Sequence, residues 1–334
     1  MKAVGYQQSL PISEPLSLID ITLPEPVASG TDILVEVKAI SVNPVDTKVR
    51  MRVAPEQGQY KVLGWDAAGI VKSVGPDVTL FKPGDKVWYA GDLTRSGTNA
   101  EYQLVDEKIV GHMPKSLGFS QAAALPLTTI TAWEMLFDRL EVEKDSNKKL
   151  LIIGAAGGVG SIMVQLAKKL TNLTVIGTAS RPETQSWLEE LGVDHVINHR
   201  ESLSKQLADK DLGEVDYVVG LTNSDDHLSE IVESIKPQGK FGLIDDPASF
   251  DILQLKRKSI SLHWEFMYTR SLFGTKDMIE QHHLLTNVAK LVDNGDIKST
   301  VAHQGGAICA KNLKKAHDLL ESQKAMGKIV LEGF

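Results

Sequence analysis

The chain has 334 residues, of which 42% are hydrophobic and 24% charged, and this length predicts about two domains with a large buried core. Asp and Glu outnumber Lys and Arg by 43 to 36, so the formal net charge is −7. That charge disfavours sequence-independent binding to nucleic acid, whose affinity comes from neutralising phosphates. The single cysteine, Cys309, excludes an intramolecular disulfide and any site with two thiolate ligands.

No stretch approaches the roughly 18 uninterrupted apolar residues of a membrane helix. The N-terminal segment Met1–Tyr6 lacks the apolar core of a signal peptide. Together with the low cysteine content, these features lead us to expect a cytoplasmic protein with no membrane or nucleic-acid partner.

The first 120 or so residues are predicted to be rich in β-strand. In Asp32–Ser41, apolar and polar residues alternate with the period of a half-buried strand. Gly69–Val74 and Lys86–Ala90 are further strand candidates, and turn sequences containing Gly and Pro lie between them. Short strands separated by such turns predict a small barrel or rolled sheet.

After Ser120 the pattern changes to an alternation of apolar strands and amphipathic helices, which is typical of a doubly wound parallel sheet. The predicted strands are Lys149–Ile153, Thr174–Thr178, His195–Asn198, Val215–Val219 and Lys240–Ile244, and Glu183–Leu191 is a predicted helix.

A glycine-rich segment, GAAGGVG, follows the first of these strands and precedes an amphipathic helix. Glycine permits a sharp turn and a close approach to a pyrophosphate, and a helix N-terminus offers unpaired N–H groups to it. The segment therefore predicts a dinucleotide site; the alternative is a tight turn with no ligand. The candidate residues are Gly154, Gly157, Gly158, Val159 and Gly160.

The cofactor type is expected to depend on the end of the second strand. An NAD site usually places an acid there, but here Ser180 and Arg181 follow the strand and no acid occurs before Glu183. Hydroxyl and guanidinium groups suit a 2′-phosphate, which a carboxylate would repel. We therefore expect NADPH; the alternative is that Arg181 is a solvated residue at a helix start.

Two N-terminal segments, SVNPVDTK (41–48) and VLGWDAAG (62–69), together with GAAGGVG, resemble the medium-chain dehydrogenase/reductase superfamily. They are similar to its zinc-free quinone and enone reductase branch, and to the bacterial zinc-type alcohol dehydrogenase-like proteins. The resemblance implies an α/β protein with a GroES-like β-barrel catalytic domain at 1–125 and a Rossmann NADPH-binding domain, a doubly wound parallel sheet, at 126–271. Residues 272–334 would return to the catalytic domain, and the resemblance further implies a homodimer.

Zinc binding is not expected, although zinc-dependent relatives exist. Zinc alcohol dehydrogenases have a cysteine ligand where this chain has Asn43, and a histidine ligand where it has Trp65. Soft thiolates and a neutral imidazole suit zinc, and neither is present at these positions. Without a Lewis acid, alcohol oxidation is disfavoured, whereas a quinone or a conjugated carbonyl accepts hydride more readily.

The resemblance implies roles for two residues near the nicotinamide. Asn43 would lie close to the nicotinamide and its ribose, and Lys48 would act as an electrostatic aid or proton relay. For Lys48 the alternative is a surface lysine beside a turn.

Further candidates come from the same resemblance. Thr128 would contact the nicotinamide half of the cofactor or cap a helix, and His199 would lie near the adenine or in a solvated loop. Phe266 and Met267 would lie in the crossover segment near the nicotinamide, or in the core. Trp65, Tyr89 and Trp133 are either apolar walls for a flat substrate or core residues.

These observations predict a zinc-independent, NADPH-dependent reductase of quinones or α,β-unsaturated carbonyls. Hydride transfer is expected in a cleft between the barrel and the Rossmann domain. Two alternatives stay open: a zinc-dependent alcohol dehydrogenase, and a catalytically silent NADPH-binding protein that acts as a sensor or partner module.

Overall fold

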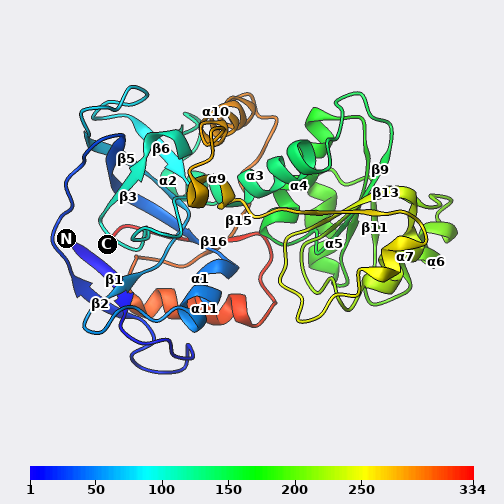
Figure 1. Ribbon diagram of the computed structural model, residues 1–334, viewed down its shortest axis with the longest axis horizontal. Helices are drawn as coiled ribbons and strands as arrows, with labels where there is room; N and C mark the ends of the chain where they lie inside the picture. The colour runs from blue at the N-terminus through cyan, green and yellow to red at the C-terminus, as the bar shows by residue number, and fades with distance from the viewer. The chain divides into compact units, whose positions relative to one another are not determined.

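The computed structural model describes all 334 residues and divides into two compact units. Unit 1 comprises Met1–Ile130 and Tyr268–Phe334, and unit 2 comprises Thr131–Met267 (Figure 1). The chain thus leaves unit 1 after residue 130 and returns to it at residue 268, whereas the domain boundaries predicted from the sequence are 125/126 and 271/272. No helix is long and apolar enough to span a membrane.

Unit 1 is built around strand β3 (Asp32–Val42), which pairs with three other strands. Its N-terminal part lies between β5 (Ala67–Val74) and β7 (Tyr102–Asp106), and its C-terminal part lies between β5 and β16 (Lys328–Glu332). The strand expected at Asp32–Ser41 is therefore confirmed and is one residue longer. Because β16 comes from the C-terminal end (red in Figure 1), this sheet joins the two chain segments of unit 1.

The other elements of unit 1 complete two sheets and their covering helices. The strand order is β15-β16-β3-β5-β6-β8 in the large sheet, with β7 paired to β3, and β2-β1-β4 in the small one. The remaining strands are β1 (Lys2–Tyr6), β2 (Ile19–Thr22), β4 (Lys61–Val62), β6 (Lys86–Tyr89), β8 (Val110–His112) and β15 (Val301–Gln304). The helices are α1 (Pro44–Arg52), α2 (Phe119–Ala123), α9 (Thr269–Phe273), α10 (Glu280–Asp293) and α11 (Ala310–Glu321), while α3 (Pro126–Trp133) carries the chain into unit 2.

Unit 2 is a six-stranded, all-parallel sheet with the order β11-β10-β9-β12-β13-β14. The strands are β9 (Lys149–Ile153), β10 (Thr174–Thr178), β11 (His195–Ile197), β12 (Val215–Gly220), β13 (Ile235–Leu243) and β14 (Ser261–Trp264). The helices are α4 (Gly158–Leu170), α5 (Pro182–Glu190), α6 (Leu203–Asp209), α7 (Leu228–Ser234) and α8 (Leu253–Lys256). The doubly wound sheet is confirmed, and its strand order reverses next to β9, where such folds bind nucleotides.

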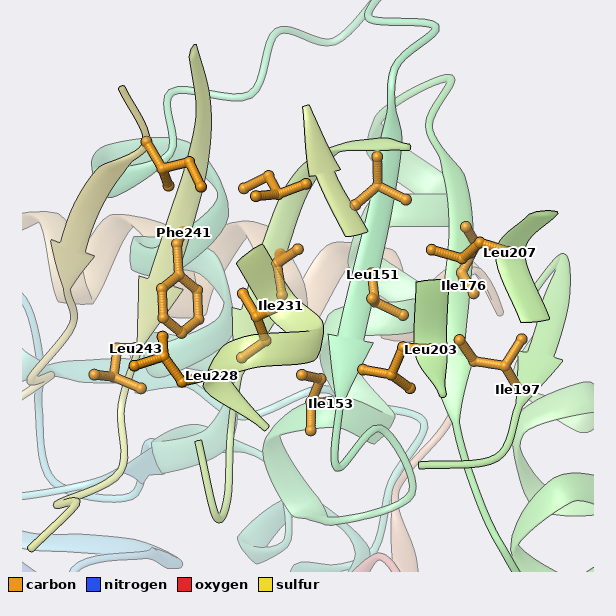
Figure 2. Packing of buried hydrophobic residues seen from close by; sticks show 14 of the residues in the cluster. Leu151, Ile153, Ile176, Ile197, Leu203, Leu207, Leu228, Ile231, Phe241 and Leu243 are labelled. Carbon is orange, nitrogen blue, oxygen red and sulfur yellow. The ribbon is translucent and has the colours of Figure 1, made fainter. Parts of the chain in front are cut away.

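One face of this sheet is covered by α6 and α7 (Figure 2). Leu203 and Leu207 of α6 and Ile231 of α7 pack on apolar residues of the strands, among them Leu151 and Phe241. Burying each such side chain contributes about 1.5–3 kcal/mol. This continuous apolar contact fixes the strands whose carboxyl ends carry the candidate cofactor residues.

A buried acid pair lies within unit 2, close to both points where the chain enters and leaves it. Glu134 begins a π-helical segment, Glu134–Arg139, and Glu265 follows β14. Arg139 Nε donates to Glu265 Oε2 at 2.8 Å, and its guanidinium lies 3.8 Å from Glu134 Oε2. Burial, followed by the adjacent Glu134 charge, raises the pKa of Glu265 to about 9 although Arg139 opposes the shift. The two carboxyl groups therefore share one arginine and retain a proton at neutral pH.

Candidate functional site

The glycine-rich segment forms the turn between β9 and α4, as predicted. The amide of Gly154 donates to Thr178 Oγ1 at 3.0 Å, which ties the turn to the end of the neighbouring strand β10. Gly157 is the N-cap of α4 and has no side chain to bond the free amides of the first helical turn. Those amides and the helix dipole favour an anion at this end of the helix.

Three glycines of this turn are needed for three different reasons. Gly154 has φ +80°, a conformation that side chains disfavour, and Gly160 packs so closely that a Cβ would lie 2.3 Å from the Ala155 carbonyl oxygen. Gly157 has φ −74°, an ordinary value that any residue adopts. A Cβ at Gly157 would meet only the Gly154 carbonyl oxygen, at 3.4 Å. Gly157 therefore faces open space, and no side chain of its own bars a ligand from its backbone.

Ser180 and Arg181 lie directly after β10, where the 2′-phosphate was expected. Arg181 is the N-cap of α5, its amide donates to Thr184 Oγ1 at 3.3 Å, and its side chain is 36% exposed. The guanidinium Nε lies 3.3 Å from the Glu183 carboxylate. Arg181 is therefore a partly exposed residue at a helix start, and the Glu183 carboxylate would compete with a bound phosphate for its charge.

The remaining cofactor candidates of unit 2 lie after β11 and β14. His199 is half-buried, its ring centroid is 6.1 Å from that of His227, and its Nδ1 is buried without a hydrogen-bond partner. Burial, with the neighbouring His227, lowers the pKa of His199, so the ring is neutral at pH 7. Phe266 is 48% exposed, whereas Met267 is buried. An exposed aromatic ring and a neutral imidazole are both suited to contact a flat heterocycle.

In unit 1, Asn43 links the end of β3 to the start of α1. The backbone N–H of Asn43 donates to Asp46 Oδ2 at 2.7 Å, in a capping box that fixes the first turn of α1. Both residues are fully buried. Burial raises the pKa of Asp46 to about 7, and the Asn43 amide and the Lys328 ammonium oppose the shift.

The Asn43 side chain lies between two oppositely charged groups from neighbouring strands. Its Nδ2 donates to Asp66 Oδ2 at 3.2 Å, and its Oδ1 accepts from Lys328 Nζ, which also lies 3.1 Å from the same Asp66 oxygen. Asp66 Oδ1 accepts from the Leu127 amide at 3.2 Å. Burial raises the pKa of Asp66 to about 6, opposed first by Lys328. Asn43, Asp46, Asp66 and Lys328 form a buried polar cluster, and the name Lys328 cluster is used for it below.

Lys48 and Thr128 have different surroundings within unit 1. Lys48 is partly exposed on α1 and lines an open pocket of about 480 Å³ together with Arg50, Arg52 and Glu321. Thr128 is buried, and its hydroxyl donates to the Leu125 carbonyl at 3.1 Å. Neither side chain is among the bonded members of the Lys328 cluster.

Three aromatic residues were candidates for the walls of a substrate pocket. Trp65 and Tyr89 are fully buried in unit 1, and the Trp65 indole donates to the Asp92 carbonyl at 3.0 Å. Trp133 is partly exposed in unit 2 and packs edge-on against Phe137, with the ring centroids 4.9 Å apart. Trp65 and Tyr89 therefore belong to the core of unit 1.

The donor set does not fit zinc. No three His, Cys, Asp or Glu side chains are grouped so that they could hold a metal ion. Trp65 offers only an N–H donor, Asn43 offers a carbonyl already bonded to a cation, and Cys309 is the N-cap of α11. Zinc prefers thiolate, imidazole or available carboxylate ligands, and this arrangement provides no such set.

Comparison with known proteins identifies the family. A model of the alcohol dehydrogenase GroES-like domain matches residues 29–125, and a model of zinc-binding dehydrogenases matches residues 191–331. A zinc-type alcohol dehydrogenase-like protein of Staphylococcus aureus is 42% identical, with 99% of each chain covered. The chain belongs to the medium-chain dehydrogenase/reductase superfamily. The resemblance noted in the sequence, and the α/β fold with a GroES-like domain and a Rossmann-like sheet, are thereby confirmed.

Two solved structures of this superfamily are informative. A putative zinc-dependent alcohol dehydrogenase from Rhizobium etli is 55% identical, with a TM-score of 0.97 over 100% of this chain and 98% of that chain. The Escherichia coli quinone oxidoreductase complexed with NADPH is 25% identical, with a TM-score of 0.85 over 99% and 100% of the two chains. This chain is therefore an oxidoreductase of the medium-chain superfamily.

Sequence patterns did not reveal Lys328, a buried cation of unit 1. It lies in no motif, and only the pairing of β16 with β3 brings it to Asn43. Tyr268 was also missed; it is buried, and its pKa is raised by burial and then by the charges of Asp46 and Asp66.

Proposed function

We propose that this protein reduces quinones or α,β-unsaturated carbonyls with NADPH and without zinc. The observation that carries the dinucleotide part is the open backbone at Gly157, where the missing side chain and the free amides at the start of α4 suit a pyrophosphate. The superfamily supports an oxidoreductase, and the quinone oxidoreductase complexed with NADPH supports this cofactor and acceptor class.

Each group of residues has a separate task in this proposal. When bound, NADPH supplies the hydride. The turn at Gly154–Gly160 and the start of α4 bind the pyrophosphate, and Arg181 with Ser180 binds the 2′-phosphate. His199, Phe266 and Thr128 are proposed to contact the heterocycles of the cofactor. Lys48 is a candidate proton relay for the acceptor oxygen, and Asn43 is proposed to contact the nicotinamide and its ribose.

An activated acceptor suits a site without a Lewis acid. A quinone or a conjugated carbonyl spreads the charge that arrives with the hydride, so orientation and nearby polar groups are sufficient. An alcohol substrate needs help to lose its hydroxyl proton at neutral pH, and a metal ion usually supplies that help. The homodimer and the cytoplasmic location expected from the sequence stay predictions.

The direct test is NADPH oxidation across a panel of quinones, alkenals and enones, with simple alcohols and NADP⁺ as the reverse assay. We expect turnover with at least one activated acceptor and none with alcohols. If NADPH binds tightly but no acceptor gives turnover, the protein is a dinucleotide-binding module rather than a reductase.

The purified protein is expected to contain far less than one zinc per chain. The reason is that the bonds of Asn43, Trp65 and Asp66 within unit 1 leave no zinc ligand set. Elemental analysis measures the metal content, and activity is compared before and after treatment with a chelator. Stoichiometric zinc that is lost together with activity would refute the proposal of a zinc-free site.

Replacing Arg181 with alanine is expected to weaken NADPH binding while NADH binding stays nearly constant. A charge-assisted hydrogen bond contributes roughly 1.5–3 kcal/mol, which corresponds to about a 10- to 150-fold loss of affinity. The matched variant is Glu183→Gln, which removes the carboxylate 3.3 Å from Arg181 and should strengthen NADPH binding. Both are measured by fluorescence titration. Equal losses for the two cofactors in Arg181→Ala would show that Arg181 does not contact the 2′-phosphate.

A further inference from the structure

Strand register brings Lys328 to Asn43. In the antiparallel pairing of β16 with β3, Ile329 lies opposite Val42, so Lys328, the first residue of β16, lies beside Asn43. On the other side of β3, Ala67 of β5 pairs with Ile40, and the Ser41 amide donates to the Asp66 carbonyl at 3.0 Å. Lys328 and Asp66 therefore approach the end of β3 from opposite neighbouring strands.

Lys328 is buried, and all three hydrogens of its ammonium group have an acceptor. These acceptors are the Asn43 carboxamide oxygen, Asp66 Oδ2 at 3.1 Å and the Val42 carbonyl oxygen at 3.4 Å. A neutral amine would have only two hydrogens for these three acceptors. Three acceptors match the three hydrogens of the ammonium form, and the adjacent Asp66 carboxylate favours that form against burial, which lowers the pKa of Lys328.

The same contacts allow only one orientation of the Asn43 carboxamide. Its Oδ1 faces the ammonium group, while its Nδ2 donates to Asp66 Oδ2 at 3.2 Å and to the Ser41 carbonyl at 3.3 Å. A flipped amide would direct its NH₂ group at Lys328 and its oxygen at the Asp66 carboxylate, so every one of these contacts would become repulsive. Both amide hydrogens are used within unit 1, and only the second lone pair of Oδ1 is left to accept from a ligand.

We propose that Lys328 is the positioning residue that orients Asn43 for the reaction: the hydrogen bond from its amino group holds the carboxamide oxygen in one direction at the junction of β3 and α1. The reaction part of this statement rests on the proposed function, whereas the orientation of Asn43 does not. Lys328 contacts neither substrate nor cofactor in this proposal; it acts through Asn43.

Three variants distinguish two possible roles of Lys328, which are to orient the Asn43 carboxamide and to balance the charge of Asp66. Lys328→Arg keeps a cation, Lys328→Met removes it, and Lys328→Met with Asp66→Asn removes both members of the ion pair. Removing one member of a buried pair destabilises strongly, so Lys328→Met is expected to lower Tm by roughly 6–20 °C. The double variant is expected to recover most of that loss because it contains no unpaired member of this ion pair.

Turnover is expected to behave differently from stability. With the most active acceptor, kcat should fall by roughly 10- to 100-fold in Lys328→Met and in the double variant, because misorientation of a positioned group has effects of this size. Lys328→Arg should stay within a few-fold of the unchanged protein. If the double variant regained both Tm and kcat, Lys328 would only balance charge, and the proposal would be overturned.

A second measurement does not depend on activity. In protein labelled with ¹⁵N at asparagine, the side-chain NH₂ signals of Asn43, assigned by their absence in Asn43→Ser, should exchange slowly with solvent. This protection should persist in Lys328→Arg and be lost in the other two variants. Retained protection in Lys328→Met would refute the orienting role. Lost protection in a protein without reductase activity would instead refute the proposed function and leave the orienting role supported.

Discussion

Replacing Gly157 with valine is expected to abolish dinucleotide binding while the protein remains folded. Gly157 has an ordinary φ of −74°, and a Cβ there meets only one backbone oxygen, at 3.4 Å, so a side chain fits the ligand-free turn. The same side chain would occupy the space of the pyrophosphate. Losing two charge-assisted hydrogen bonds, each of roughly 1.5–3 kcal/mol, weakens NADPH binding by at least about 100-fold.

A matched control is available at another helix N-cap. Gly118 precedes α2 with φ −73° and ψ 166°, close to the −74° and 179° of Gly157, and a Cβ there meets nothing within 4 Å. Gly118→Val therefore makes the same substitution on the same backbone, away from the predicted ligand, and should bind NADPH normally. Circular dichroism and thermal melting verify folding, and fluorescence titration measures binding. Near-normal affinity in folded Gly157→Val would mean that the segment is only a tight turn.

Gly160 gives the opposite expectation. A Cβ there would lie 2.3 Å from the Ala155 carbonyl oxygen and 2.5 Å from the Ala155 Cα, and neither backbone atom is free to move aside. Substitution at Gly160 should therefore disturb the packing of α4 on the turn and not only the ligand. This contrast is why Gly157, and not Gly160, is the informative position.

Replacing Glu265 with glutamine is expected to remove a one-proton contribution to the pH dependence of stability between about pH 7 and 9, above the pKa values of Asp46 and Asp66. The pKa of Glu265 is raised to about 9 by burial and by Glu134, against an unfolded value of 4.5. Between these values the folded protein holds a proton that the unfolded chain has released. The free energy of unfolding therefore falls as the pH rises, by at most about 1.4 kcal/mol per pH unit for one proton.

Glutamine suits this position because it remains neutral and can still accept from Arg139, which then pairs with Glu134 alone. Denaturant unfolding at several pH values measures the slope. The control is Glu141→Gln, which changes an exposed acid whose pKa is lowered by its bond to Lys240 and which is ionised throughout this range. A slope that persists unchanged in Glu265→Gln would mean that Glu265 is ionised in the folded protein.

Local patterns were sufficient to predict the glycine-rich turn and the elements around it in unit 2. The β9–α4 turn, the strand Thr174–Thr178 and the position of Arg181 at the start of α5 depend on residues close in sequence. The period of apolar residues and the placement of glycine report on such short-range structure. They did not reveal which glycine tolerates a side chain, because the crowding at Gly160 and the open space at Gly157 depend on how the turn closes.

The Lys328 cluster of unit 1 was harder to predict from the sequence, because its members are far apart along the chain. Asn43 and Asp66 lie in segments that resemble a known family, but their partner Lys328 is brought to them by the register of β16 on β3. A single lysine in a short apolar strand carries no periodic signal. The acid pair of Glu134 and Glu265 is hidden in the same way, because its members are joined through Arg139 and burial, which one sequence does not display.

The discontinuous construction of unit 1 also imposes an order on synthesis. Thr131–Met267, the whole of unit 2, leaves the ribosome before β16, so unit 2 is able to fold while unit 1 is still incomplete. At roughly 5–20 residues per second, Asp66 waits about ten to fifty seconds for Lys328. During that interval the stretch of β3 that later pairs with β16, Ala39–Val42, has an open edge, which is a template for unwanted strand pairing. Until β16 is made, the nascent chain therefore exposes a strand edge that the finished protein covers.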